Sequence, residues 1–189
     1  MCSAAALLFS GCVTGHRSFD IPVATAAGSA STKSDKFAII EVTDDRHFEN
    51  KPGDPSTPSI KGDVLSLSPA EKSTFIGRQR NGFGHAAGDI ALPSGQTVQA
   101  KVSDLLAEGF RRRGYTMSAS GDGVALPIKV EIRDFWSWTT PGFFALSFEA
   151  RLNCKVIINR AGHDVVLEVK GYALNHGQLA KNKNWEEAY

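Results

Sequence analysis

The sequence predicts an α+β fold: a two-layer sandwich in which one or two helices cover one face of a mostly antiparallel sheet. Two observations carry this prediction. Long segments in the second half of the chain alternate between apolar and charged residues, which is typical of antiparallel strands that bury one face only. A segment before them has an apolar stripe at helical spacing, and such a stripe can cover the buried face of the sheet.

The first half of the domain contains one clear strand and long irregular segments. Residues 36–44, "KFAIIEVTD", are rich in β-branched residues and predict a strand. Residues 49–61 hold three prolines and a glycine, a density that predicts a long loop. A short strand is expected at 64–67. Residues 75–92 contain four glycines, and we expect an ordered loop there with a strand-like end at 89–92.

A helix is predicted over residues 97–113. Its apolar stripe consists of Val98, Val102, Leu105, Leu106 and Phe110. Ser94 or Thr97 can cap its N-terminus. The arginines at 111–113 complement the helix dipole at the other end, and Gly114 ends the helix. This helix is therefore the element expected to cover the sheet.

Three further strands are expected to form a meander. The first, in "LPIKVEIRDFWSW" at 126–138, has apolar residues at alternate positions. The second, at 144–158, alternates without an error, and the third follows at 165–170. Pro141-Gly142 and residues 159–164 supply the two hairpin loops. Strands joined by short loops pair antiparallel, which is why we expect a mostly antiparallel sheet.

A second helix is predicted at the end of the chain, in "NWEEAY". Asn184 and Glu187 have the spacing of a capping box, which predicts a helix that starts at Asn184. One turn of helix is not stable alone, so we expect the natural chain to continue. We therefore expect a single domain over residues 37–189, truncated in its C-terminal helix.

The N-terminal residues resemble a lipoprotein signal. Residues 4–9 are apolar, and "FSGC" at 9–12 has the pattern of a lipobox, in which small residues precede the cysteine that receives acyl chains such as palmitate. We expect a signal peptide over 1–11, incomplete because no basic residue precedes its short core. Residues 12–36 are then the lipidated Cys12 and a flexible tether. A short buried strand or a disordered tag is the alternative.

Composition narrows the location and the partners. Val13 stands where an aspartate would resemble an inner-membrane retention signal, so we expect the periplasmic face of the outer membrane. The formal net charge of +1 gives no overall field that would attract nucleic acid. The chain has three cysteines, Cys2, Cys12 and Cys154. If the first leaves with the signal and the second is acylated, no disulfide framework is expected.

The order of elements resembles the YajG-type family of uncharacterised bacterial lipoproteins. The residues that carry the resemblance are "FSGC" at 9–12, "VSDLLAEGFRRRGYTM" at 102–117, and the stretch from "LPIKVEI" to Phe148. The resemblance covers most of residues 37–189 and implies a helix-on-sheet domain. It implies no catalytic residue, because the family has no established activity. Similar lipoproteins assist lipopolysaccharide assembly or lipid-exporting ABC transporters.

Few side chains predict chemistry. None of the five histidines has a His or Cys at metal-ligand spacing, so neither a metal site nor another cofactor is expected. Asp44, Asp45 and His47 can form an acid–base site or a solvated strand end, and we favour the strand end. "GFGHAAGD" at 82–89 resembles a phosphate-binding loop but lacks the lysine and the strand–helix context of one. The arginines at 111–113 can bind phosphates or form a charged helix end, and we favour the helix end.

Aromatic residues gather around the first hairpin of the meander. Phe135, Trp136, Trp138, Phe143 and Phe144 lie in "FWSWTTPGFF". Hairpin tips are normally polar and exposed. Aromatic rings that stay at the surface mark a contact with a partner, whereas buried rings close the end of the core. We take Phe135, Trp136, Trp138 and Phe143 as candidate partner contacts, and core closure as the alternative.

These observations predict a non-enzymatic envelope lipoprotein that faces the periplasm. Its membrane attachment is the lipid on Cys12, and its partner is an envelope protein. The alternative is a carrier or chaperone for a lipid or glycolipid, held between the helices and the sheet.

Overall fold

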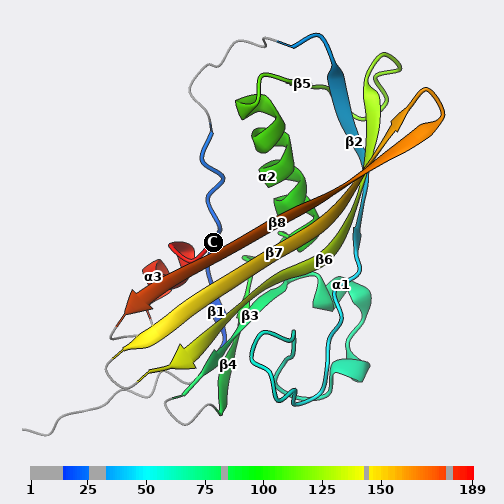
Figure 1. Ribbon diagram of the computed structural model, residues 1–189. Coiled ribbons are helices and arrows are strands. Elements are labelled where there is room, and N and C mark those ends of the chain that lie inside the picture. The colour runs from blue at the N-terminus through cyan, green and yellow to red at the C-terminus, as the bar shows by residue number, and fades with distance from the viewer. Residues whose placement is uncertain (1–14, 26–32, 82–84, 143–144, 178–180) are drawn as a thin grey trace, which may run out of the picture.

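The computed structural model describes residues 15–25, 33–81, 85–142, 145–177 and 181–189. Within these residues, eight strands form one sheet and three α-helices accompany it (Figure 1). The α+β class is therefore confirmed.

The strands are β1 (Arg17–Ser18), β2 (Lys36–Asp44), β3 (Phe75–Arg80), β4 (Ala86–Ala91), β5 (Thr116–Met117), β6 (Leu126–Pro141), β7 (Leu146–Arg160) and β8 (His163–Gly177). The helices are α1 (Pro69–Lys72), α2 (Val98–Arg112) and α3 (Asn182–Glu186), with the 3-10 helix η1 (Val64–Ser66) before α1.

The sheet is mixed, not uniformly antiparallel. The long meander β6–β7–β8 is antiparallel, as expected. β6 also pairs in parallel with β2 and β3, and β1–β4 and β2–β5 are parallel pairs as well. The alternation within a strand shows which side chains share a face, but it does not show the direction of the neighbouring strand. The expectation of a mostly antiparallel sheet therefore holds for the meander and not for the N-terminal strands.

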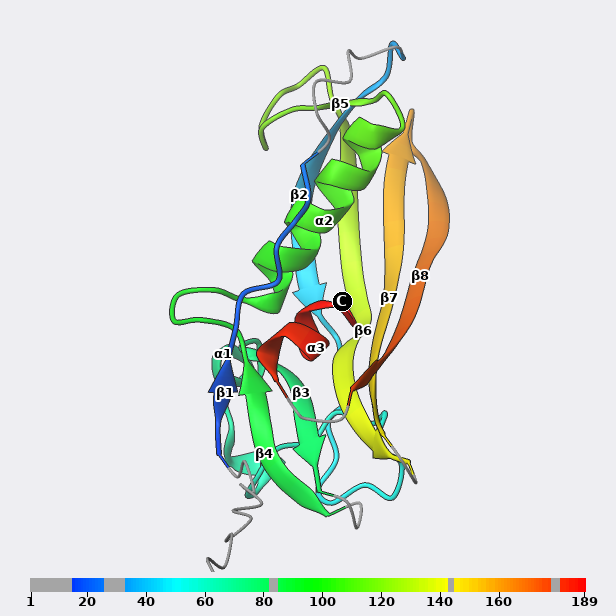
Figure 2. The ribbon, with the colours of Figure 1, turned by 90° about the vertical axis from the view of Figure 1, so that its left-hand side faces the viewer.

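The core lies between the meander and the helices. In β7 the residues Phe148, Ala150, Cys154, Val156 and Ile158 are buried, as their alternation predicts. α2 places Val98, Val102 and Leu106 in the same core, and Thr97 caps it by accepting a hydrogen bond from the Ala100 N–H. Figure 2 shows α2 and α3 on the same side of the sheet. We call this side the inner face and the opposite side the outer face.

A bulge in β6 changes which residues reach the inner face. The register shifts between Ile132 and Asp134, so that Phe135 lies opposite Leu152 and Trp136 opposite Arg151. Residues directly opposite each other in an antiparallel pair share a face. Phe135 therefore joins the inner face, whereas Trp136 lies on the outer face with Arg151.

Two segments before α2 differ from the sequence expectation. Residues 64–66 form η1 instead of a strand, with Asp63 accepting a hydrogen bond from the Leu65 N–H. Residues 75–92 contain the hairpin strands β3 and β4 instead of an ordered loop. Its glycines mislead because Gly77 and Gly88 lie where another backbone approaches closely.

The last helix begins earlier than predicted. α3 starts at Asn182 with Lys181 as N-cap and no side-chain capping bond, so the expected capping box of Asn184 and Glu187 is absent. Glu187 instead accepts a hydrogen bond from the Asn175 amide at 2.9 Å. Trp185 is buried, and its ring meets Phe148 edge-on at 5.0 Å between centroids. Tertiary packing, not the cap, holds this short helix.

Part of the expected tether is packed into the domain. Arg17–Ser18 pairs with β4, and Phe19 and Ile21 are buried in the core. The Arg17 Nε donates to the Gln79 side chain at 2.8 Å. Burial of two large apolar side chains is enough to attach a polar segment to the domain. The sequence does not show where the domain receives these two side chains.

Candidate functional site

The long Pro-rich loop folds back over the outer face of the sheet. Phe48 packs edge-on against Trp136 at 5.8 Å between ring centroids. Ser59 and Ile60 are buried, and the Lys61 N–H donates to both carboxylate oxygens of Asp89 at 3.0 and 3.1 Å. The loop thus covers the end of the sheet formed by β3, β4 and the second half of β6.

The ends of this loop are held together by one asparagine. The side-chain oxygen of Asn50 accepts a hydrogen bond from the Val64 N–H at 2.8 Å, and the side-chain NH₂ group of Asn50 donates to the Asp63 carboxylate at 2.7 Å. Lys51, the next residue, adopts a left-handed backbone with φ of 50°. That conformation is uncommon for a residue other than glycine and requires support from its surroundings. Asn50 provides this support, and it thereby fixes the direction in which the Lys51 side chain leaves the backbone.

Two adjoining cavities lie between the loop and β3. One, of about 270 Å³, is lined by Lys51, Pro52, Ser59, Arg78, Arg80, His85 and Ala86. The other, of about 590 Å³, is lined by Asn50, Lys51, Ile60, Lys61, Gly62, Asp63 and Arg78. Lys51 and Arg78 line both. We call the shared space, with the basic residues Lys51, Lys61, Arg78, Arg80 and His85 around it, the cationic cleft.

Arg78 is the buried member of the cleft. It is only 9% exposed, and its Nε lies 3.8 Å from the nearer Asp89 oxygen, which is ion-pair distance but beyond hydrogen-bond distance. Among the described residues the Arg78 Nε has no hydrogen-bond partner. Burial lowers the pKa of Arg78, and the charge of Asp89 raises it in part. Within the part of the chain that the structure describes, the positive charge of Arg78 is therefore incompletely compensated.

The β3–β4 hairpin positions Arg80 and His85 beside Arg78. Arg80 is two residues further along the same strand, so its side chain leaves on the same face. Burial lowers its pKa, and Asp54 opposes this shift. The His85 N–H donates to the Asn81 side chain at 3.0 Å, which closes the end of the hairpin. Three basic groups of the cleft thus come from one hairpin.

A third cavity, of about 540 Å³, lies further along the outer face. Its lining residues are Asp134, Arg151, Leu152, Asn153, Lys170, Gly171 and Tyr172. Arg151 donates to Asp134 at 3.0 Å, Tyr172 donates to Glu149 at 2.7 Å, and Lys170 pairs with Glu168 at 2.5 Å. Because the charged and hydroxyl groups of this cavity already have carboxylate partners, it is a weaker candidate site than the cationic cleft.

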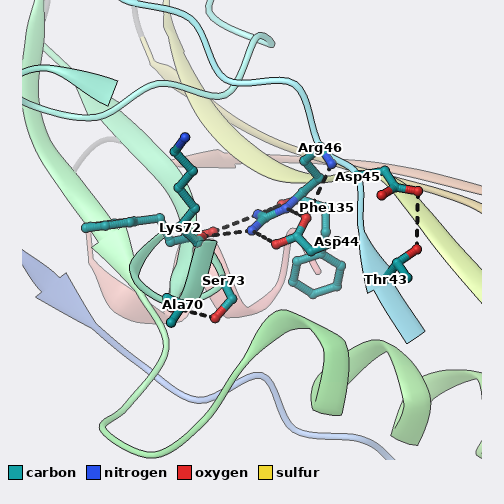
Figure 3. Close-up of polar contacts among 9 residues, drawn as sticks. Thr43, Asp44, Asp45, Arg46, Ala70, Lys72, Ser73 and Phe135 are labelled. Carbon is teal, nitrogen blue, oxygen red and sulfur yellow. Dashed lines mark hydrogen bonds and ion pairs between the residues drawn. The ribbon is translucent and has the colours of Figure 1, made fainter. Parts of the chain in front are cut away.

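The predicted cluster of Asp44, Asp45 and His47 does not converge. Figure 3 shows the Asp44 carboxylate turned toward Arg46, which donates to it through Nε and Nη2, both at 2.7 Å. Asp45 accepts from Thr43, and the exposed His47 pairs with Glu49 at 3.3 Å. The acid–base alternative is therefore wrong. The favoured solvated strand end holds for Asp45 and His47, whereas Asp44 is largely buried.

Arg46 has a structural task. Its Nη1 donates to the carbonyls of Phe75 and Phe135 at 2.7 and 3.0 Å, and its Nη2 donates to the Lys72 carbonyl at 2.9 Å (Figure 3). With the two bonds to Asp44, all five guanidinium donors have an acceptor. Arg46 fills the place beside β6 between the end of β2 and the start of β3. It has no donor left for a ligand.

The aromatic residues proposed as partner contacts are buried. Phe135, Trp136 and Trp138 are all less than 9% exposed, and Phe143 lies outside the described residues. Phe135 stacks on Tyr189 at 5.1 Å between centroids, and the Arg151 guanidinium lies 5.8 Å from the Trp138 ring centroid. The expected contact surface is therefore wrong for these three residues. Phe135 closes the core on the inner face, and Trp136 packs under Phe48 of the loop on the outer face.

The remaining candidates fall in different places. Cys12 lies outside the described residues. Cys154 is a buried free thiol whose pKa burial raises to about 12, with a smaller contribution from Asp134. Arg112 pairs with Glu108 at 3.2 Å at the end of α2, as a charged helix end does. Among the described His, Cys, Asp and Glu residues, no group of three or more is placed to hold a metal ion.

Sequence reasoning missed the cationic cleft. Lys51 and Lys61 lie in a segment correctly predicted as a loop, and Arg78 and Arg80 in a segment predicted as an ordered loop instead of a strand. The available signal was the i, i+2 spacing of the two arginines in "FIGRQR", which places both on one face if the segment is a strand.

No family model and no curated protein match this chain. Several solved structures are similar to it, and two of them are described here. One is a protein of Xanthomonas campestris described with the family model DUF330, at 11% identity over 92% of this chain and 84% of that one, with a TM-score of 0.48. The other is an uncharacterized protein, at 8% identity over 92% and 88%, also with a TM-score of 0.48. The YajG-type resemblance stays a prediction. None of the described helices is long and apolar enough to cross a membrane.

Proposed function

We propose that this chain is the folded domain of a bacterial envelope lipoprotein, anchored through Cys12 on the periplasmic face of the outer membrane, that binds a protein partner and catalyses no reaction. The single observation that carries the binding role is the exposed strand β8. The lipobox "FSGC" supports the anchor. Asp44 supports the absence of catalysis, because Arg46 engages the carboxylate that an acid–base site would need.

β8 is a long edge strand. It has 15 residues and pairs with β7 along its whole length, and β7 is the one strand it pairs with among the described residues. An edge strand presents backbone N–H and C=O groups that another strand can pair with. Native proteins usually shorten or cover such edges. A 15-residue edge is therefore a suitable template for an added strand.

Apolar side chains accompany this edge. Five of them are between 45% and 60% exposed: Val165, Val166, Leu167, Tyr172 and Leu174. Val165 and Leu167 lie on the inner face, and the other three lie on the outer face. An exposed apolar row on both faces suits a partner strand whose own side chains are apolar on both faces. We therefore propose that the partner is an extended segment of an envelope protein, added to β8.

In-cell cross-linking of the full chain tests this role. We expect Val166→Lys combined with Leu174→Lys to remove the cross-linked envelope complexes, because both side chains flank the edge. Leu65→Lys is the matched control, since Leu65 is 83% exposed in η1, away from β8. Circular dichroism and urea unfolding must show that the variants fold. Unchanged complexes in the double variant would refute the assignment, and so would a complex that contains only copies of this chain.

Fatty-acid labelling tests the anchor separately. We expect Cys12→Ser to abolish labelling and membrane fractionation and to leave the domain folded. Cys154→Ala is the control and should keep both, because Cys154 is buried in the core. Labelling that survives Cys12→Ser would discard the lipoprotein proposal. The carrier alternative stays a prediction, and the cavities described above lie on the outer face, away from α2.

A further inference from the structure

We infer that the cationic cleft is a binding site for a phosphate group, carried by a free phosphorylated molecule or by a lipid headgroup. This inference depends neither on the anchor at Cys12 nor on the edge of β8. It rests on the burial of Arg78, on the convergence of basic residues from two distant segments, and on the adjoining cavities between them.

The charges around the cleft are unbalanced. The basic residues that line it are Lys51, Lys61, Arg78, Arg80 and His85. Three carboxylates lie around the cleft, and each has another partner as well. Asp63 is engaged by the Asn50 amide and the Leu65 N–H, and Asp89 by the Lys61 N–H and by His16 at 3.9 Å. Asp54 acts on Arg80 but also on Arg151. A chain with a net charge of only +1 thus gathers five basic residues around one cleft, and Arg78 among them has its nearest carboxylate beyond hydrogen-bond distance.

Arg78 makes this more than a charged surface. A buried guanidinium normally has its donors satisfied, as Arg46 does in the same protein. The Arg78 side chain is 10% exposed, against 0% for Arg46, but it has a carboxylate only at 3.8 Å and an Nε without a hydrogen bond among the described residues. Burying a charge without full compensation is costly. An anion in the cleft would provide the missing compensation, which is a reason for such an arginine to be retained.

The residue types favour phosphate over a carboxylate. Arginine presents a planar set of donors that matches the oxygens of a phosphate, and lysine adds a point charge. A phosphate monoester carries nearly two negative charges and several acceptor oxygens, so it can engage Arg78, Arg80 and Lys51 together. The two cavities, of about 270 and 590 Å³, share Lys51 and Arg78. A phosphate at this shared wall leaves the larger cavity for the group that carries it.

The cleft is also held in shape before any ligand binds. Asn50 joins the two ends of the loop and supports the left-handed backbone of Lys51. The Lys61 backbone is bonded to β4 through Asp89, and Arg78 and Arg80 stand on β3. Basic groups fixed on rigid elements lose less conformational entropy on binding than mobile surface lysines do.

Calorimetric titration with inorganic pyrophosphate tests the site. All proteins are the full chain with Cys12→Ser, so that no acyl chain contributes. We expect Arg78→Gln to weaken binding about tenfold or more, because a hydrogen bond to a charged group is lost. Lys51→Gln, on the exposed loop, should weaken it about fivefold. Arg160→Gln and Lys129→Gln are the controls. Each removes an exposed positive charge outside the cleft and should change the affinity for pyrophosphate by less than about twofold.

Flotation with vesicles identifies the source of the phosphate. Binding to phosphatidylglycerol vesicles that Arg78→Gln removes, and that phosphatidylcholine vesicles do not show, assigns a lipid headgroup. Pyrophosphate binding without vesicle binding assigns a free phosphorylated ligand. If Arg78→Gln fails to fold, Lys51→Gln and Lys61→Gln carry the test. The inference is overturned if neither probe binds, or if the control variants weaken binding as much as the cleft variants do. Loss of envelope complexes in the β8 variants leaves this result unaffected.

Discussion

Arg46→Met tests whether one buried arginine joins the two halves of the sheet. In the native protein its five donors engage the Asp44 carboxylate and the carbonyls of Lys72, Phe75 and Phe135. Methionine keeps much of the side-chain volume but has no donor. The substitution therefore leaves a nearly buried carboxylate and three backbone acceptors without their partner. These four groups belong to β2, α1, β3 and β6, so the substitution removes hydrogen bonds that join four elements.

The expected loss of stability is large. Breaking a buried ion pair by removing one member costs about 3–5 kcal/mol. Part of this cost is recovered when water reaches the carboxylate and the three carbonyls, so we expect the lower half of that range. About 3–4 kcal/mol is a substantial share of the roughly 5–15 kcal/mol that stabilises a typical domain. In a domain of this size it corresponds to a fall in Tm of about 6–16 °C.

Urea unfolding followed by Trp fluorescence measures this loss. Arg133→Met is the control. Arg133 lies in the β6 bulge, close in sequence to Phe135, but it is half exposed and pairs with Glu131 at the surface. We expect the control to cost less than about 1 kcal/mol. Asp44→Leu combined with Arg46→Met should recover part of the loss, because the unpaired carboxylate is gone. A cost below about 1 kcal/mol for Arg46→Met alone would refute the reasoning.

Three further substitutions test the stability of the domain. Gly77→Ala should destabilise the domain by about 1–3 kcal/mol, because its Cβ would lie 2.6 Å from the Ser137 carbonyl oxygen. Gly109→Ala, in an open position of α2, should stabilise the domain by about 0.5–1 kcal/mol. Thermal unfolding of both variants measures these changes in stability. The raised pKa of Cys154 keeps its proton in the folded state above pH 9, where the unfolded thiol ionises, so folding stability should fall as the pH rises from 9 toward 12. Cys154→Ala should flatten this decline in urea titrations at pH 8, 9, 10 and 11. An equally steep decline in the variant would show that other groups cause it.

The elements with a local signal were predictable from sequence. The alternation over 144–158 and the stripe from Val98 to Phe110 follow from the periods of a strand and a helix, which depend on nearby residues alone. Both elements are present. α2 buries Val98, Val102 and Leu106 and leaves Leu105 and Phe110 half-buried, and β7, at 146–160, buries most of the predicted side chains. Phe135, Trp136 and Trp138 were harder. Their burial depends on the β6 bulge and on a loop that is more than 70 residues earlier in the chain.

The sequence by itself determined the α+β class, the antiparallel meander, the covering helix and the presence of a long loop at 49–61. The tertiary structure alone decided that β2 and β3 join β6 in parallel, that Arg46 closes the gap between them, and that the loop folds over β3. The cationic cleft follows from these three facts, because Lys51 meets Arg78 only once the loop lies on the outer face. Local periodicity reports the face of an element, whereas a site assembled from distant segments depends on strand register and loop placement, which neighbouring residues do not encode.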